Sequence, residues 1–253
     1  MQLSFGSGEL WGERTDVTGS GIGPRQFGIL QDITVDIDWT TKELYGQNQF
    51  PQAIARGQGK ISGKAKFAQI FGLLWADVCF GQTPTVGQLL TMPNEAGTVP
   101  AVTPYEITVA QASAYNDDLG VIYAATGIRF NRVATPSAAG QYSVNLATGV
   151  YTFSSADANA AVKISYLYNN TTSGNKLVIL NQPLGATPTF KATFNQPISP
   201  GPTPNVPWTL RLNACTAQKL SLPTRLDDFT IQEFDFNAFA DASGEIGILS
   251  TVE

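Results

Sequence analysis

Apolar and polar residues alternate along two stretches near the start of the chain. Apolar side chains occupy every second position of residues 33–39, the pattern of a strand with one packed face and one wetted face. Residues 42–47 then predict a turn, and the alternation returns in residues 59–67. The second stretch therefore predicts a second strand, with a basic exposed face. The lysines on that face are Lys60, Lys64 and Lys66.

The apolar spacing changes to that of a helix from residue 68 onward. Apolar residues recur there every three or four positions, and Trp75 widens the stripe they form. Gly81 is placed to end the helix, because glycine readily adopts the left-handed conformation found at helix C-termini. We expect one clear helix in the chain. The residues at helical spacing include Ile70, Leu73, Leu74 and Val78.

The remaining chain predicts further strands, with prolines and glycines between them. Residues 6–28 are rich in glycine and predict either an arm that orders on a neighbouring molecule or a surface loop. Short alternating runs fill residues 105–168 at the spacing of a small antiparallel sandwich. Five prolines in residues 196–207 exclude a regular element there. Longer strands are expected at 175–180, 189–194, 208–212, 219–222 and 229–236, and a short one near the end.

Composition and charge narrow the possible roles. Charged residues are 14% of the chain and apolar residues 43%, which leaves less charged surface than a typical soluble monomer carries. Either a compact all-β protein rich in small polar residues or an obligate oligomer explains this balance. The formal charge of −5 offers no basic face to grip phosphates. It fits either plain solubility or a surface that repels DNA and lets it slide past.

Residues for common catalytic sites are missing from the sequence. The chain has no histidine, which excludes Ser-His-Asp triads, Cys-His pairs and the usual zinc sites with histidine. Cys79 and Cys215 are isolated, and we expect them to be buried small apolar residues. The glycines of residues 19–23 lack the strand before and the helix after that a phosphate-binding loop needs. We therefore predict no catalytic, metal or cofactor-binding residue, and no enzyme.

Two pairs of neighbouring carboxylates need a separate explanation. Asp117–Asp118 and Asp227–Asp228 could suggest glycoside hydrolysis, which uses two carboxyl groups across one site. Adjacent residues of an extended chain point to opposite faces, however, and both pairs lie in turn-like settings where Asp caps the backbone. The sequence also contains no apolar run of the ~20 residues that a membrane span needs, and no usual export signal. We expect synthesis in a cytoplasm and no membrane partner.

Several short motifs resemble those of a known family. They are LWG at 10–12, GPRQFG at 23–28, KELYG at 42–46 and GKISGKAK at 59–66, with DDFTI at 227–231 and DASG at 241–244. In these segments the chain resembles the tail tube (major tail) proteins of long-tailed bacteriophages. The resemblance implies a tail-tube β-sandwich or barrel with one flanking α-helix. We assign this core to residues 1–98 and 172–253, and residues 99–171 to an inserted β-rich segment.

The resemblance also implies a function and a set of partners. Subunits of this family form sixfold rings that stack into a hollow tube around a tape measure protein, and DNA passes down the lumen during ejection. The expected location is the tail of the virion, after synthesis in the host bacterium. Other implied partners are the tail terminator and the baseplate or tip proteins, while passing DNA is not bound specifically.

The basic stripe on the second strand gives a candidate contact between subunits. In the family interpretation, Lys60, Lys64 and Lys66 meet acidic residues of a neighbouring subunit, and complementary charges fix the register. The alternative is a solvated strand face. The candidate acidic partners are Asp36, Asp38, Glu233 and Asp235.

Two other functions remain open at this point. A carbohydrate-binding or glycoside-cleaving phage β protein would explain the strands and aromatic residues, and would be a discrete monomer or trimer with affinity for sugar. A capsid decoration or tail-completion protein would share the virion setting, but would stop at a closed ring.

Overall fold

The computed structural model describes residues 6–17, 23–196 and 208–251, and divides the chain into two compact units. The first unit contains residues 1–84 and 177–253, and the second contains residues 85–176. Strands dominate the described residues, and their one α-helix is α1 (Gly72–Phe80). The expectation of a mainly β protein with one helix is confirmed. The glycines at 19–21 and the proline-rich residues 197–207 lie outside the described residues.

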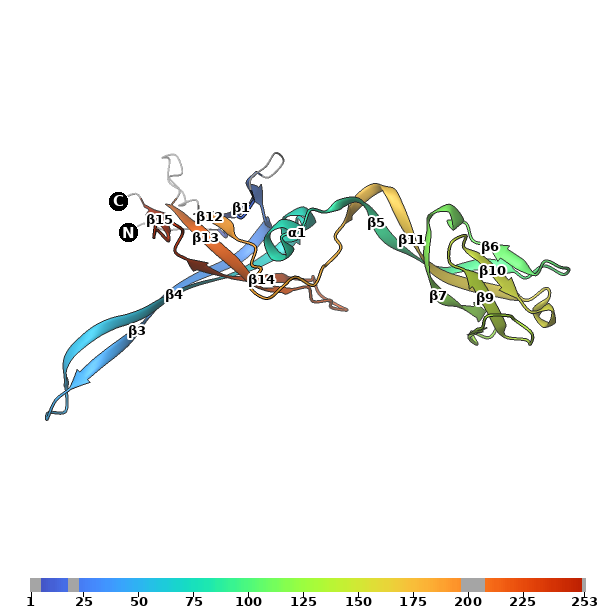
Figure 1. The fold of residues 1–253 in the computed structure, drawn as a ribbon, viewed down its shortest axis with the longest axis horizontal. Coiled ribbons are helices and arrows are strands. Elements are labelled where there is room, and N and C mark those ends of the chain that lie inside the picture. Colours follow the sequence, from blue (N-terminus) through green and yellow to red (C-terminus); the bar gives the residue numbers. More distant parts are fainter. Residues whose placement is uncertain (1–5, 18–22, 197–207, 252–253) are drawn as a thin grey trace. The chain divides into compact units, whose positions relative to one another are not determined.

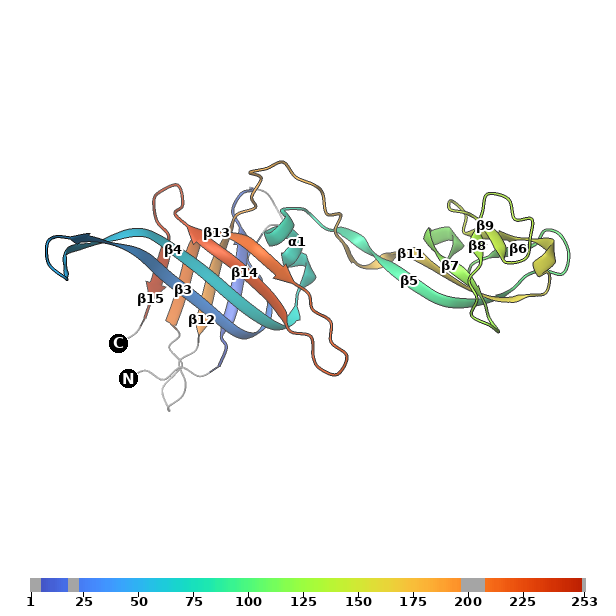
Figure 2. The same ribbon diagram turned by 90° about the horizontal axis from the view of Figure 1, so that it is seen from below.

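The first unit is built on one eight-stranded sheet (Figures 1 and 2). Its order is β2-β1-β12-β13-β14-β4-β3, with β15 also paired to β13, and all of these pairs are antiparallel. The strands are β1 (Glu9–Arg14), β2 (Arg25–Gln26), β3 (Gly28–Tyr45), β4 (Pro51–Ile70), β12 (Phe190–Gln196), β13 (Trp208–Ser221), β14 (Gln232–Phe239) and β15 (Gly247–Ser250).

The core of the first unit lies between the apolar face of this sheet and α1. Trp75 of the helix packs edge-on against Phe234, with the ring centroids 4.7 Å apart. Its ring also meets Phe27 and Phe67 edge-on. The helix ends at Gly81, which has φ 61° and donates its N–H to the Asp77 carbonyl, as the sequence predicted. Burial of this aromatic cluster packs the helix against β4, against β14 and against the residue between β2 and β3.

Some boundaries in the first unit differ from the sequence prediction. The helix starts at Gly72, because β4 continues to pair with β3 as far as Ile70. Residues 42–45 belong to β3, where the sequence predicted a turn. The glycine-rich stretch 6–28 contains β1 and β2 within the sheet, and the runs at 208–212 and 219–222 are one strand, β13. Residues 177–180 form no strand, contrary to expectation.

The second unit contains two smaller sheets around its own core. A three-stranded sheet has the order β5-β11-β7, and a four-stranded sheet the order β6-β10-β9-β8. The only parallel pair in the described residues is β8 with β9. The strands are β5 (Thr85–Thr98), β6 (Glu106–Thr108), β7 (Tyr115–Tyr123), β8 (Asn131–Arg132), β9 (Gln141–Asn145), β10 (Val150–Phe153) and β11 (Ala161–Lys176); two 3-10 turns are η1 (Ala112–Ala114) and η2 (Ser155–Asp157).

Tyrosine hydroxyls and carboxylates are paired inside the second unit. Asp118 accepts hydrogen bonds from Tyr142 at 2.6 Å and from Tyr151 at 2.9 Å. Tyr123 donates to the buried Asp157. These bonds satisfy hydroxyls and carboxylates that burial would otherwise leave without partners. The tyrosines expected as strand residues therefore form core, with their polar ends tied to acids.

The limits of the second unit are set by one long strand pair. β5 and β11 pair from Thr85 with Lys176 to Thr98 with Ala161. The second unit consequently begins earlier and ends later than the inserted segment 99–171 expected from the sequence. Pro93 is accommodated because it lies at a bulge between the paired positions Met92 and Glu95 of β5, where no ladder bond is required of it.

Candidate self-assembly interface

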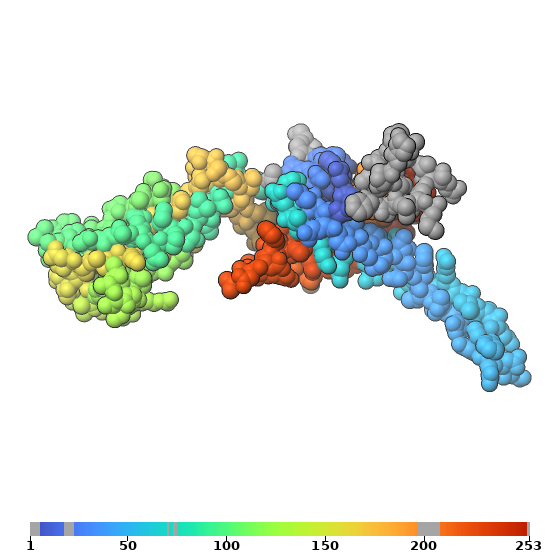
Figure 3. Space-filling model, turned by 180° about the vertical axis from the view of Figure 1, so that it is seen from behind, coloured from blue at the N-terminus to red at the C-terminus, as the bar shows by residue number. Residues whose placement is uncertain are grey.

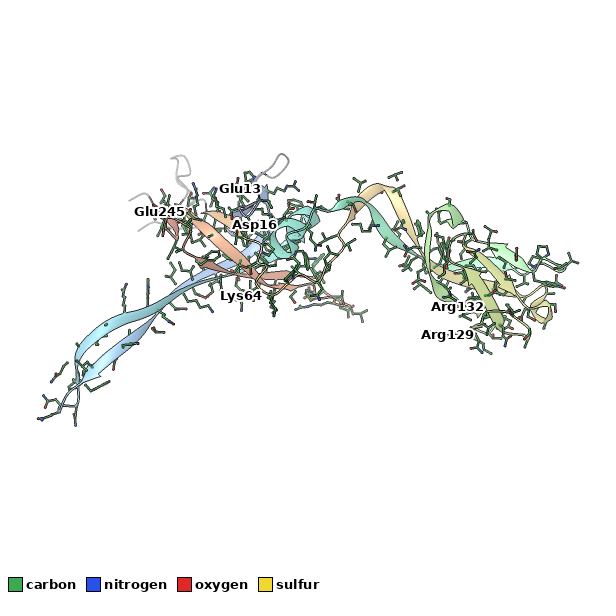
Figure 4. All side chains as sticks on the ribbon, in the orientation of Figure 1. Glu13, Asp16, Lys64, Arg129, Arg132 and Glu245 are labelled. Atoms are coloured by element: carbon green, nitrogen blue, oxygen red, sulfur yellow. The ribbon has the colours of Figure 1, made fainter. Side chains whose placement is uncertain are left out.

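The polar face of the first unit's sheet carries columns of opposite charge. Register places Lys60 opposite Asp38 on β3, and Lys64 opposite Asp235 on β14. Lys66 lies between acidic partners on both neighbouring strands, Asp32 and Glu233. Across the sheet, the acidic side chains of β3 are thus followed by the lysines of β4 and then by the acidic side chains of β14. Figure 4 labels Lys64 on this part of the sheet.

The structure brings together, within one chain, all the residues predicted to join two subunits. Cross-strand neighbours of opposite charge already complement one another there, which favours the observed strand register. The ion pair on this face joins Lys219 Nζ to Glu233 Oε2 at 3.9 Å. Within the described residues, none of the three lysines lies within 4 Å of a carboxylate oxygen. The residues concerned are Asp36, Asp38, Lys60, Lys64, Lys66, Glu233 and Asp235.

A hollow of about 340 Å³ lies on this polar face. Lys60, Lys64 and Gln218 line it together with Asp36 and Asp235. The Oδ1 atom of Asp235 is buried and finds no hydrogen-bond donor among the described residues. Unpartnered buried oxygens are uncommon in folded proteins, so this face has capacity for donors from another molecule.

The distal part of the β3–β4 hairpin, residues 39–57, extends beyond the rest of the sheet. We call it the hairpin arm (Figures 1 and 3). β14 pairs with β4 only from Ile61 to Phe67, so the two strands of the arm pair with each other alone. Phe50 is 80% exposed and Ile54 62%. The other exposed large apolar or aromatic residues of the arm are Trp39, Leu44 and Tyr45.

The arm has little internal support. The guanidinium of Arg56 lies over the Trp39 ring, 4.5 Å from its centroid. Tyr45 donates its hydroxyl to Glu43. A two-stranded hairpin with so few contacts is at best marginally stable in water. The exposed apolar side chains of the arm therefore indicate that it packs against another molecule.

An apolar groove lies at the root of the arm. Its volume is about 630 Å³, and polar residues such as Gln31, Asp32 and Gln196 border it. The groove and the arm are different surfaces of the same chain, both apolar. The apolar residues that line the groove are Ile33, Val35, Ile37, Phe194, Trp208, Leu210 and Leu249.

Acidic side chains and cysteines are the groups in this histidine-free chain that could bind a metal ion. The described residues contain no group of three acidic, cysteine or histidine side chains that could hold a metal ion. Cys79 and Cys215 are free, and burial raises the pKa of each thiol to about 12, so almost no thiolate forms at neutral pH. Of the two neighbouring carboxylate pairs, Asp118 accepts hydrogen bonds from two tyrosines, and Asp228 pairs with Arg225 at 2.9 Å in an exposed turn.

The helical elements of the same part of the chain are α1 and the two 3-10 turns. None of its helices has both the length and the apolar character needed to cross a bilayer.

Sequence reasoning missed the hairpin arm, because it assigned residues 42–47 to a turn. No period-2 alternation marks these strands, since residues 41–45 read Thr-Lys-Glu-Leu-Tyr and residues 52–56 read Gln-Ala-Ile-Ala-Arg. No protein-family model matches this chain, and no curated protein sequence matches it. The resemblance found in the sequence motifs therefore stays a prediction.

Proposed function

We propose that this protein is the tail tube subunit of a long-tailed bacteriophage, a structural protein that assembles with copies of itself. Its rings, six subunits each, would stack into a hollow conduit for DNA ejection. The observation that carries the proposal is the hairpin arm, whose apolar side chains stand uncovered on both strands. In a self-assembling protein, a neighbouring subunit would cover these apolar side chains.

The energetics of the arm support assembly. Full burial of one large apolar side chain contributes about 1.5–3 kcal/mol. Covering a few of the arm's side chains, such as Phe50 and Ile54, therefore supplies a substantial part of an association free energy. Entropy lost on association offsets some of that gain, which is why assembly should depend strongly on protein concentration.

The geometry of the exposed surfaces favours open-ended assembly. The arm and the apolar groove are different from each other, so a contact between them is heterologous. Heterologous contacts close into rings or continue as filaments. Within the described residues no strand pairs with the outer edge of β3, which leaves it available to extend the sheet into a neighbouring subunit.

The charge of the polar sheet face gives DNA no strong hold, whether that face meets a neighbouring subunit or the lumen. The part of this face that β3, β4 and β14 form outside the arm, together with Lys219 of β13, carries five acids and four lysines, a net charge of 4 − 5 = −1. Such a face lacks the excess of cations that releases counterions from phosphates. The acids are Asp32, Asp36, Asp38, Glu233 and Asp235, and the lysines are Lys60, Lys64, Lys66 and Lys219.

The proposed partners follow from the tube. They are the neighbouring subunits, a tape measure protein in the lumen, and the tail terminator and baseplate or tip proteins at the two ends.

The second candidate, a sugar-binding protein, is less well supported, because Tyr142, Tyr151 and Tyr166 are buried in the second unit and offer no open platform. A capsid decoration or tail-completion protein would form closed rings that do not stack, whereas the rings of a tube subunit stack.

Negative-stain electron microscopy over a concentration series tests the proposal. We expect sixfold rings and hollow tubes as the concentration rises. Closed rings that never stack would favour the tail-completion or decoration role. Monomers at every concentration would overturn the proposal, and binding to a sugar array would then be the next measurement.

A further inference from the structure

The segment that follows β11 has the sequence of a strand without its pairing. Residues 177–180 read Leu-Val-Ile-Leu, and valine and isoleucine are among the residues that favour strands most. β11 nevertheless ends at Lys176, and no strand follows before β12. The side chain of Ile179 is 67% exposed, and both its neighbours are exposed too. We call residues 177–181 the linker segment.

One edge of the linker segment is already occupied. The amide of Gln82, turned so that its nitrogen faces Val178, donates to the Val178 carbonyl and accepts from the Leu180 N–H at 3.1 Å. Further along, Gln182 donates its side-chain nitrogen to the Phe80 carbonyl at 3.0 Å. These contacts hold the segment against the end of α1 and the residues that follow it, in the first unit.

The other edge of the linker segment is free. Backbone groups of successive residues in an extended chain point to opposite edges. Because Val178 and Leu180 use one edge, the N–H and C=O of Ile179 face the other. Among the described residues nothing bonds to either group of Ile179. The segment is thus fixed in place and presents one open edge, with exposed apolar side chains above and below it.

We propose that the linker segment receives the hairpin arm of a second copy, by pairing as a short strand with the outer edge of β3 between Trp39 and Tyr45. That edge has no strand partner among the described residues, and its neighbouring side chains Leu44 and Tyr45 are exposed. Strand addition would supply backbone hydrogen bonds, and the apolar side chains on both sides would supply burial.

The pairing is between molecules, because one chain cannot make it. Figures 1 and 2 both show the tip of the β3–β4 hairpin at one end of the first unit and the orange stretch after β11 beside α1, at the other end. The donor and the acceptor are different surfaces, so each copy can give one arm and receive another. The inference rests on the proposed self-assembly and names the surface that receives the arm.

A pair of substitutions at one exposed position tests the inference. Ile179→Pro removes the N–H on the open edge, whereas Ile179→Ala keeps it and only shortens the side chain. We expect Ile179→Pro to raise the protein concentration needed for assembly by roughly tenfold or more, and Ile179→Ala to raise it far less. Both variants should keep the melting temperature of the isolated subunit, since Ile179 is 67% exposed and does not belong to the core cluster.

The outcomes separate this inference from the proposed function. Assembly of Ile179→Pro at the wild-type concentration would overturn the inference and leave self-assembly intact. Failure of the wild-type protein to assemble at any concentration would instead remove the proposed function, and this inference with it.

Crosslinking between two variants gives direct evidence of the contact. Ile179→Cys protein is mixed with Thr41→Cys or Lys42→Cys protein under assembling conditions and oxidised; these arm positions point to opposite faces of β3. We expect a disulfide-linked dimer with at least one arm variant. Ile128→Cys, exposed in the second unit, is the control for Ile179→Cys and should give none. The absence of a dimer with both arm variants would overturn the inference.

Discussion

The ring of Phe236 on β14 lies directly over Gly63, its register partner on β4. A β-carbon at position 63 would overlap three atoms of that ring. Both residues are buried on the apolar face of the sheet, where Phe236 also stacks on Phe234 with 5.8 Å between the centroids. The absence of a side chain at Gly63 therefore makes room for one aromatic ring in the centre of the first unit's core.

Gly63→Ala should destabilise the subunit. The ring of Phe236 has to move against Phe190 and Phe234, and overpacking of this kind costs about 1–3 kcal/mol. Urea denaturation followed by tryptophan fluorescence measures the change in the free energy of unfolding. Gly59→Ala, on the same strand but next to the exposed ring of Trp39, is the matched control. Equal effects of the two substitutions would contradict the role given to Gly63.

Ile54→Ser should weaken assembly and leave the subunit folded. Ile54 is 62% exposed on the hairpin arm, so its replacement costs the isolated subunit little, but it removes apolar area that assembly would bury. Analytical ultracentrifugation over a concentration series gives the assembly threshold. Ile128→Ser changes an equally exposed isoleucine of the second unit. If both variants assemble as poorly as each other, the arm has no special part in assembly.

Lys64→Glu should impair assembly without unfolding the subunit. The reversed charge lies opposite Asp235 and beside a column of acids, and like charges directly opposite each other destabilise a strand pair by about 0.2–1 kcal/mol. That loss is small compared with the stability of the subunit. A contact between subunits that depends on the charge pattern would be weakened more. Lys64→Gln removes the charge without reversing it and should have an intermediate effect. Tubes of normal length and abundance from Lys64→Glu would refute the charge-matching hypothesis.

The second unit should lose stability in alkali. Burial, with a smaller contribution from the bond to Asp157, raises the pKa of Tyr123 to about 12, and burial beside Glu95 does the same for Tyr166. Below pH 10, the ordinary tyrosine value, both the folded and unfolded states keep these protons. Above it the unfolded chain loses them first, so stability falls as the pH rises from about 10 towards 12.

Thermal melts at a series of pH values, combined with tyrosinate absorbance, check this dependence. Tyr166→Phe keeps the ring but removes one titrating hydroxyl, so its stability should decline less steeply over the same pH range. The pKa shifts would be disproved if every tyrosine of the folded protein ionised near pH 10.

Local patterns in the sequence predicted the elements that local interactions determine. Alternation identified the proximal parts of β3 and β4, and Gly81 marked the end of α1, since each depends on neighbouring residues only. Strand lengths were harder to predict. The arm remains a strand beyond the sheet with no packed face to mark it, and β5 passes through Pro93 by means of a bulge that only its pairing with β11 reveals.

The candidate interface was only partly predictable, for a related reason. The lysine column follows from alternation within one strand, and was found. Its pairing with Glu233 and Asp235 depends on β14, which joins β4 from the far end of the chain, and no local signal fixes that register. The strand tendency of residues 177–180 was also recognised, but these residues pair with no strand in the described part of the chain.

Thr85 and Lys176, where the second unit begins and ends, are partners in one antiparallel ladder. The chain therefore leaves and re-enters the first unit at two points about one strand spacing, or ~5 Å, apart. A domain whose termini lie that close can be removed and replaced by a tight turn, or exchanged for another domain, without any change in the strand order of the host sheet. This position is consequently a ready acceptor for grafted modules, in natural recombination as well as in the laboratory.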